Sequence, residues 1–71
     1  MNLKSSNGGQ MGIFWGESTE TLSMAIKNAA AAANKSLPGK TLEWLEVAEI
    51  RGGFKDNTTL QFQVSVRIGY A

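Results

Sequence analysis

Residues 60–70 alternate between apolar and polar side chains, the pattern of a β-strand with one buried face. The apolar positions are Leu60, Phe62, Val64, Val66, Ile68 and Tyr70, and the polar positions between them are Gln61, Gln63, Ser65 and Arg67. The apolar set is expected to face a core. The alternation therefore places Gln63 on the opposite face of the strand.

Residues 41–51 are expected to form the preceding strand of a hairpin whose loop is residues 52–57, which begin with two glycines. If Leu45 and Val47 face the same core, then Trp44 faces away from it, on a side shared with Glu46 and Ala48. Trp44 and Gln63 are thus predicted to share the outer face of one hairpin. An indole ring beside an amide edge suits a planar heteroaromatic ligand.

A helix is predicted from about residue 19 to about residue 36, with Ser18 as its N-cap and Glu20 in its first turn. Pro38 and Gly39 end it. The expected buried stripe has apolar residues three or four positions apart: Leu22, Ile26, Ala29, Ala33 and Leu37. The small side chains in residues 29–33 would let this helix lie close to a sheet.

The N-terminal part divides at residue 10. Residues 1–10 are polar and rich in glycine and serine, so they are expected to form a flexible lead-in to a single domain of residues 11–71. Residues 11–15 predict a short strand closed by Gly16. Trp15 is either a core filler or a second aromatic near a subunit interface, and the core filler is favoured because Trp15 is in phase with Met11 and Ile13. The predicted order is β-α-β-β: an α+β fold with a three-stranded antiparallel sheet wrapped on one helix and its other face free.

Composition limits the chemistry. The chain has 71 residues, no cysteine and no histidine, which excludes thiolate and imidazole metal sites, cysteine nucleophiles and histidine-based triads. The net charge of +1 gives no electrostatic case for nucleic acid or an anionic membrane. No secretion signal or membrane span is evident, so the cytoplasm is the expected location. A domain this small buries little surface alone, and other copies of the chain are the expected support.

The order and spacing of several short motifs resemble those of the dodecins, small flavin-binding proteins that assemble as hollow dodecamers. These motifs are Gly-Glu-Ser at 16–18, Ala-Ile at 25–26, Leu-Glu-Trp-Leu-Glu-Val at 42–47, Arg-Gly at 51–52, Phe-Gln-Val at 62–64 and Ile-Gly-Tyr at 68–70. Spacings agree throughout except for two extra residues at 38–39. The resemblance spans residues 16–70 and implies the β-α-β-β fold given above.

The resemblance also implies a function: a flavin-storage or sequestration protein rather than an enzyme. It implies that Trp44 stacks on the isoalloxazine ring, that Gln63 bonds the polar edge of the ring, and that two flavins lie between tryptophans of symmetry-related subunits. The expected cofactor is FMN or riboflavin, with FAD possible, and the expected partner is the chain itself, as a homododecamer. Arg51 is a candidate contact for a flavin phosphate or a partner's carboxylate.

Two other functions stay open. In the first, the chain forms an oligomer that uses the same faces for assembly alone, with Trp44 as a subunit anchor, since tryptophan is enriched in interface hot spots. The second is a small enzyme on the same shell, which ranks last because the remaining polar groups form no recognisable constellation. Glu46 could pair with Arg51 or Arg67 across strands.

Overall fold

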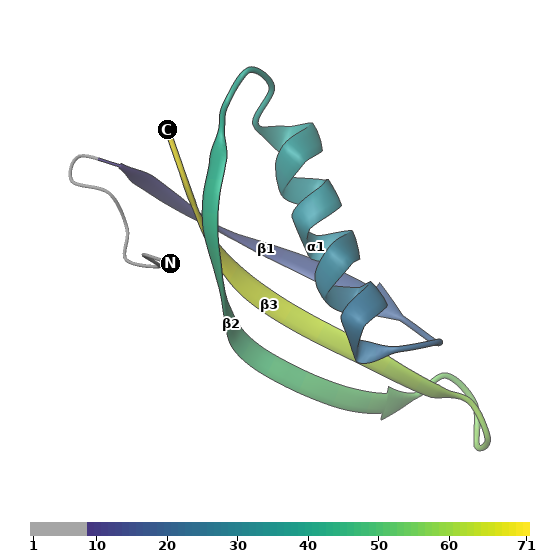
Figure 1. Ribbon diagram of the computed structural model, residues 1–71. Helices are drawn as coiled ribbons and strands as arrows, with labels where there is room; N and C mark the ends of the chain where they lie inside the picture. The colour runs from purple at the N-terminus through teal and green to yellow at the C-terminus, as the bar shows by residue number, and fades with distance from the viewer. Residues whose placement is uncertain (1–8) are drawn as a thin grey trace.

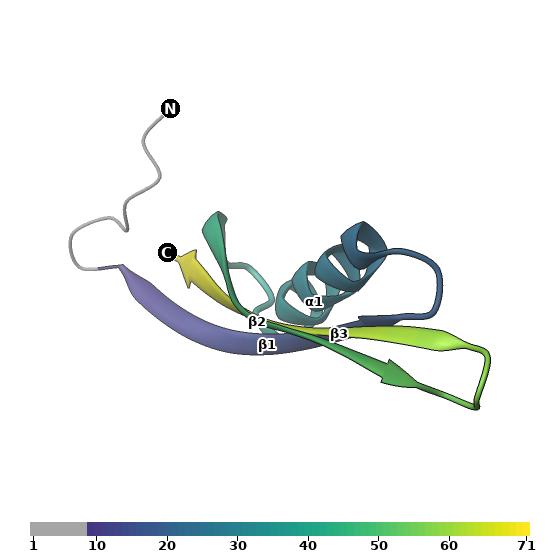
Figure 2. The same cartoon turned by 90° about the horizontal axis from the view of Figure 1, so that it is seen from below.

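The computed structural model describes residues 9–71. They form, in chain order, β1 (Gln10–Ser18), α1 (Leu22–Ser36), β2 (Leu42–Phe54) and β3 (Leu60–Tyr70). The sheet is antiparallel with the order β1-β3-β2, so β3 is central (Figure 1). Helix α1 lies across one face, and no other element of residues 9–71 covers the opposite face (Figure 2). The predicted α+β architecture is confirmed.

The predicted lead-in of residues 1–10 falls mostly outside the described residues. Strand β1 begins at Gln10, one residue before the expected start of the domain, and ends at Ser18, beyond the expected end at Trp15. The continuation to Ser18 follows from pairing, because Glu17 and Ser18 still lie opposite Gln63 and Phe62 of β3. Within residues 9–71, no helix has the length and apolar content needed to cross a membrane.

The core lies between β3 and α1. Its fully buried side chains come from alternate residues of β3 and from every fourth residue of the helix: Val64, Val66, Ile68, Ala25, Ala29 and Ala33. The predicted core face of β3 is confirmed at Val64, Val66 and Ile68, whereas Leu60, at the loop end of the strand, is exposed. Gly16 of β1 lies beneath the helix, where an added Cβ would collide with the backbone of Ala25 and Ala29. Small residues on both elements let the helix lie close to the sheet.

The helix stripe differs from the prediction at four positions. Ala25 is fully buried, whereas the predicted Leu22, Ile26 and Leu37 are only partly buried. The close approach of helix and sheet explains the difference, because only alanine fits along the line of nearest contact. The larger side chains of Leu22 and Ile26 pack against the core from its margin.

The helix also begins later than predicted. Its N-cap is Thr21, whose Oγ1 accepts a 3.0 Å hydrogen bond from the backbone N–H of Met24. Ser18, the predicted cap, instead accepts bonds from the N–H groups of Glu20 and Thr21 and so shapes the turn after β1. Glu20 consequently lies before the first helical turn. Both hydroxyl residues satisfy the sequence rule for a cap, and the length of β1 decides between them.

Trp15 lies on the helix-free face, so its interpretation as a core filler was wrong. In the β1–β3 register, Phe14 and Gly16 lie opposite the core residues Val66 and Val64, while Trp15 lies opposite Ser65. Trp15 is 67% exposed, and Met11 and Ile13 beside it are about half exposed. The three residues are in phase, as expected, but the helix requires glycine at position 16, and alternation then turns Trp15 outward.

Strand β2 departs from strict alternation at two register shifts, between Leu42 and Trp44 and between Val47 and Glu49. Ala48 is the extra residue of the second shift and has no direct partner on β3. Ala48 is exposed, and its predicted place in the outer row of Trp44 and Glu46 stays a prediction. After the shift, Glu49 takes that face.

Candidate functional site

The helix-free face of the β2–β3 hairpin carries a row of directly opposed residues, which point to the same side of a sheet. The pairs are Trp44 with Gly69, Glu46 with Arg67, Glu49 with Ser65, and Arg51 with Gln63. Trp44 and Gln63 thus share this face, as the hairpin pattern predicted. Arg51 joins them because the irregularity at Ala48 changes the parity of β2.

The indole of Trp44 lies over Gly69. A Cβ at position 69 would collide with the pyrrole ring, so the absence of a side chain lets the indole lie against the backbone of β3. Trp44 remains only partly buried. The sheet therefore supports one side of the indole, and part of its surface stays accessible.

Trp44 and Gln63 lie far apart within one chain. Trp44 pairs with Gly69, and Gln63 precedes Gly69 by six residues on β3. At about 3.3 Å per residue, the two positions are separated by roughly 20 Å. This is longer than a tricyclic ring system, so a ring stacked on Trp44 does not reach Gln63 of the same chain. A site that uses both residues requires a second copy.

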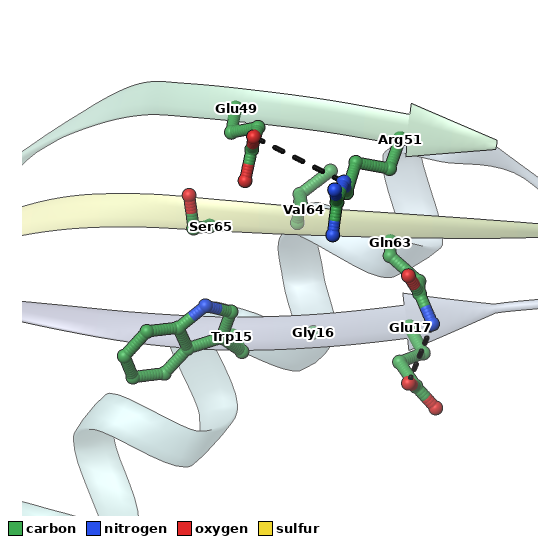
Figure 3. Close-up of a pocket in the computed structure, with 8 residues that line it drawn as sticks. All are labelled: Trp15, Gly16, Glu17, Glu49, Arg51, Gln63, Val64 and Ser65. Carbon is green, nitrogen blue, oxygen red and sulfur yellow. Dashed lines mark hydrogen bonds and ion pairs between the residues drawn. The ribbon is translucent and has the colours of Figure 1, made fainter.

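Gln63 and Arg51 line a hollow of about 300 Å³ that all three strands form (Figure 3). Its other lining residues are Trp15, Gly16, Glu17, Glu49, Val64 and Ser65. Arg51 extends from β2 over β3 beside Val64, Gln63 turns toward Glu17 of β1, and the indole of Trp15 forms the β1 side (Figure 3). Sequence reasoning missed Glu17 and Glu49 here and gave Trp15 only as the less favoured alternative, because only the strand register brings these residues beside Gln63.

Glu17 orients the amide of Gln63. Nε2 of Gln63 donates a 3.2 Å hydrogen bond to Oε1 of Glu17. Nε2 of Gln61 donates a second bond, also of 3.2 Å, to Oε2 of the same carboxylate. A carboxylate accepts only, so it selects the NH₂ end of the amide. The carbonyl oxygen of Gln63 is then the end left for an external N–H or O–H donor.

The two arginines of this face differ in how firmly they are paired. Arg67 Nη1 lies 3.1 Å from Glu46 Oε1, which settles the cross-strand partner of Glu46. Arg51 Nε lies 3.9 Å from Glu49 Oε2, and both side chains are largely exposed. Exposed, loosely held pairs contribute little free energy. The guanidinium of Arg51 is therefore the better placed of the two for an external anion.

Comparison with known proteins identifies the family. A sequence model of the dodecin family matches residues 14–71. A curated dodecin of Thermus thermophilus is 40% identical over 55 residues, which cover 78% of this chain and 77% of the relative.

Solved structures agree. A dodecin from Streptomyces davaonensis has a TM-score of 0.76 at 31% identity, over 87% of this chain and 88% of its own. A crystal structure of a Thermus thermophilus protein has a TM-score of 0.74 at 35% identity, with the same coverage. The chain belongs to the dodecin family.

Proposed function

We propose that this protein binds flavin in the cytoplasm and stores or sequesters it. Flavin rings would stack between Trp44 indoles of symmetry-related subunits in a hollow homo-oligomer, a dodecamer as the family resemblance implies. The observation that carries the proposal is the position of Trp44 and Gln63 on one helix-free face, about 20 Å apart along β3. That spacing requires two copies for one site, and a two-fold interface brings the same patch from both.

The residues present fit a flavin. The indole of Trp44, supported by Gly69, offers a flat surface, and offset stacking of aromatic rings contributes about 1 kcal/mol beyond area burial. The carbonyl oxygen of Gln63 suits an N–H on the polar edge of the ring. Arg51 supplies a cation for the phosphate of FMN or FAD, whereas riboflavin would use the ring contacts alone.

A ligand-free oligomer is the second candidate. Met11, Ile13 and Trp15 form an exposed apolar row on the helix-free face of β1, an edge strand. Such a row is typical of surfaces covered by another chain. This candidate predicts a large particle that does not respond to flavins.

Titration separates the two candidates. Riboflavin and FMN are added to the flavin-free protein, to Trp44→Ala and to Lys27→Ala, a control on the exposed side of α1. We expect strong quenching of flavin emission by the wild-type protein and Lys27→Ala, and little by Trp44→Ala. Unchanged emission with micromolar wild-type protein, or equal binding by Trp44→Ala, contradicts flavin storage at this site. Light scattering on the same samples measures the particle mass.

A further inference from the structure

Trp15 is one of only two tryptophans in the chain, and it is 67% exposed. Large aromatic side chains are seldom left this open without a contact to make. The indole does not support the core, because Phe14 and Gly16 occupy the helix side of β1. Trp15 instead lines the hollow that contains Gln63 and Arg51 (Figure 3).

The register places Trp15 within reach of anything that bonds to Gln63. Trp15 lies opposite Ser65, and Gln63 is two residues from Ser65 on the same face of β3. Such diagonal neighbours lie about 7–8 Å apart, within reach of an aromatic side chain. A planar molecule whose edge meets the Gln63 carbonyl therefore lies beside the Trp15 indole.

The hollow offers an indole face, an amide and one guanidinium to a planar ring, and the carboxylates of Glu17 and Glu49 also line it. Its volume of about 300 Å³ is at the lower limit for small-molecule pockets, which suits a single ring system. Glu17 fixes the Gln63 carbonyl as an acceptor, and Arg51 is the cation on the opposite side.

We propose that Trp15 is a second aromatic contact for the flavin ring. The bound ring then meets Trp44 of one copy and Trp15, with Gln63, of another. This inference rests on the proposed flavin function and adds a residue from β1 to the site.

The test compares Trp15→Leu and Trp15→Phe with Ile13→Leu. Ile13 is the matched control. It lies on the same strand and the same face as Trp15 and is also exposed, but it does not line the hollow. Dissociation constants for riboflavin and for lumichrome, the ring without its ribityl chain, come from emission quenching. We expect Trp15→Leu to weaken both about three- to tenfold, and Trp15→Phe and Ile13→Leu to stay within about twofold of the wild type.

The outcomes separate this inference from the proposed function. Wild-type affinity in Trp15→Leu, together with lost binding in Trp44→Ala, would overturn the role of Trp15 and leave flavin storage intact. No binding by the wild-type protein would overturn both. The particle mass of each variant is measured by light scattering. If Trp15→Leu dissociates into smaller particles, the indole contacts another subunit, and its role as a ligand contact is overturned.

Discussion

The indole of Trp44 occupies the space that a side chain at position 69 would fill. Trp44 and Gly69 are direct partners across β2 and β3, so the ring lies against the central strand rather than extending into solvent. Gly69 thereby decides how the ring surface of Trp44 is presented, although it offers no side chain to a ligand.

Gly69→Ala should move the indole without unfolding the chain. The new Cβ would meet the pyrrole ring, and the indole would leave its place on β3. We expect riboflavin affinity to fall by about tenfold, the size of one lost well-aligned stacking contact. Gly53→Ala is the control, because a Cβ at position 53 has no atom within 4 Å. Fluorescence titration of both variants checks the prediction, and equal affinities would refute the role of Gly69.

Arg51→Ala should weaken FMN more than riboflavin. Arg51 is only loosely paired with Glu49, at 3.9 Å, and lines the same hollow as Gln63. A guanidinium close to a phosphate contributes about 1.5–3 kcal/mol when it is hydrogen-bonded, so we expect a loss of roughly tenfold for FMN and little change for riboflavin. Arg67→Ala, whose arginine is held by Glu46 at 3.1 Å, serves as the control. Equal losses for both flavins would show that Arg51 does not contact the phosphate.

Glu17→Gln should relax the recognition of the ring N–H. In the wild-type protein the Glu17 carboxylate holds the NH₂ end of Gln63, which leaves the carbonyl as the end that would accept a bond from the proposed flavin. Methylation of flavin N3 removes the donor for that carbonyl, and wild-type protein should bind N3-methylriboflavin several-fold more weakly than riboflavin. A neutral amide at position 17 lets the side-chain amide of Gln63 flip, so the difference in affinity between riboflavin and N3-methylriboflavin should shrink. Glu49→Gln should keep it, and a titration in which Glu17→Gln discriminates as well as the wild type would count against this orientation.

Gly16→Ala should destabilise the fold itself. The added methyl group would meet the carbonyl of Ala25 and the amide of Ala29, both backbone groups that move only with the helix. Overpacking of this kind costs about 1–3 kcal/mol of unfolding free energy. Gly52→Ala is the control, since its Cβ would make only an ordinary 3.7 Å contact with Leu60. Urea denaturation followed by circular dichroism should separate the two variants, and equal midpoints would argue against close helix–sheet contact at Gly16.

The pattern of β3 was readable from the sequence because the strand is central and the two register shifts fall on β2, so that every residue from Leu60 to Tyr70 keeps a partner there. Its alternation placed Val64 on the core and Gln63 on the open face. Strand β1 was not readable in this way. Apolar residues occupy both of its faces, and the residue beneath the helix is Gly16, which has no hydrophobic signal. The face of Trp15 therefore depended on a helix contact that periodicity does not encode.

The candidate site could be predicted only in part, because its geometry also depends on how the strands pair. The shared face of Trp44 and Gln63 follows from alternation, but their separation along β3 depends on register, and the hairpin pattern left the register open. The position of Arg51 depends on the irregularity at Ala48, a residue with no turn or bulge signature. Glu17 belongs to the candidate site only because β1 pairs with β3 and places Glu17 opposite Gln63.

The β2–β3 loop should make the thermal stability of the fold depend on pH in the acidic range. Asp56 Oδ1 accepts bonds from the backbone N–H groups of Thr58 and Thr59, at 2.9 and 2.8 Å, and from the Thr58 hydroxyl. These bonds, that of the Thr58 amide first, lower the pKa of Asp56 below its ordinary value of 3.8.

A lowered pKa means that the folded state favours the charged carboxylate. The stabilisation is fully present above the unfolded pKa and is lost as pH falls through the lower folded pKa. Asp56→Ala should therefore melt at a lower temperature than the wild type at pH 7, and the gap should narrow below about pH 4. Asp56→Asn keeps one acceptor oxygen and should fall between the two. Thermal melts of the three proteins from pH 7 to pH 2.5 measure the gap, and a gap that stays constant over this range would show that the charge of Asp56 does not hold the loop.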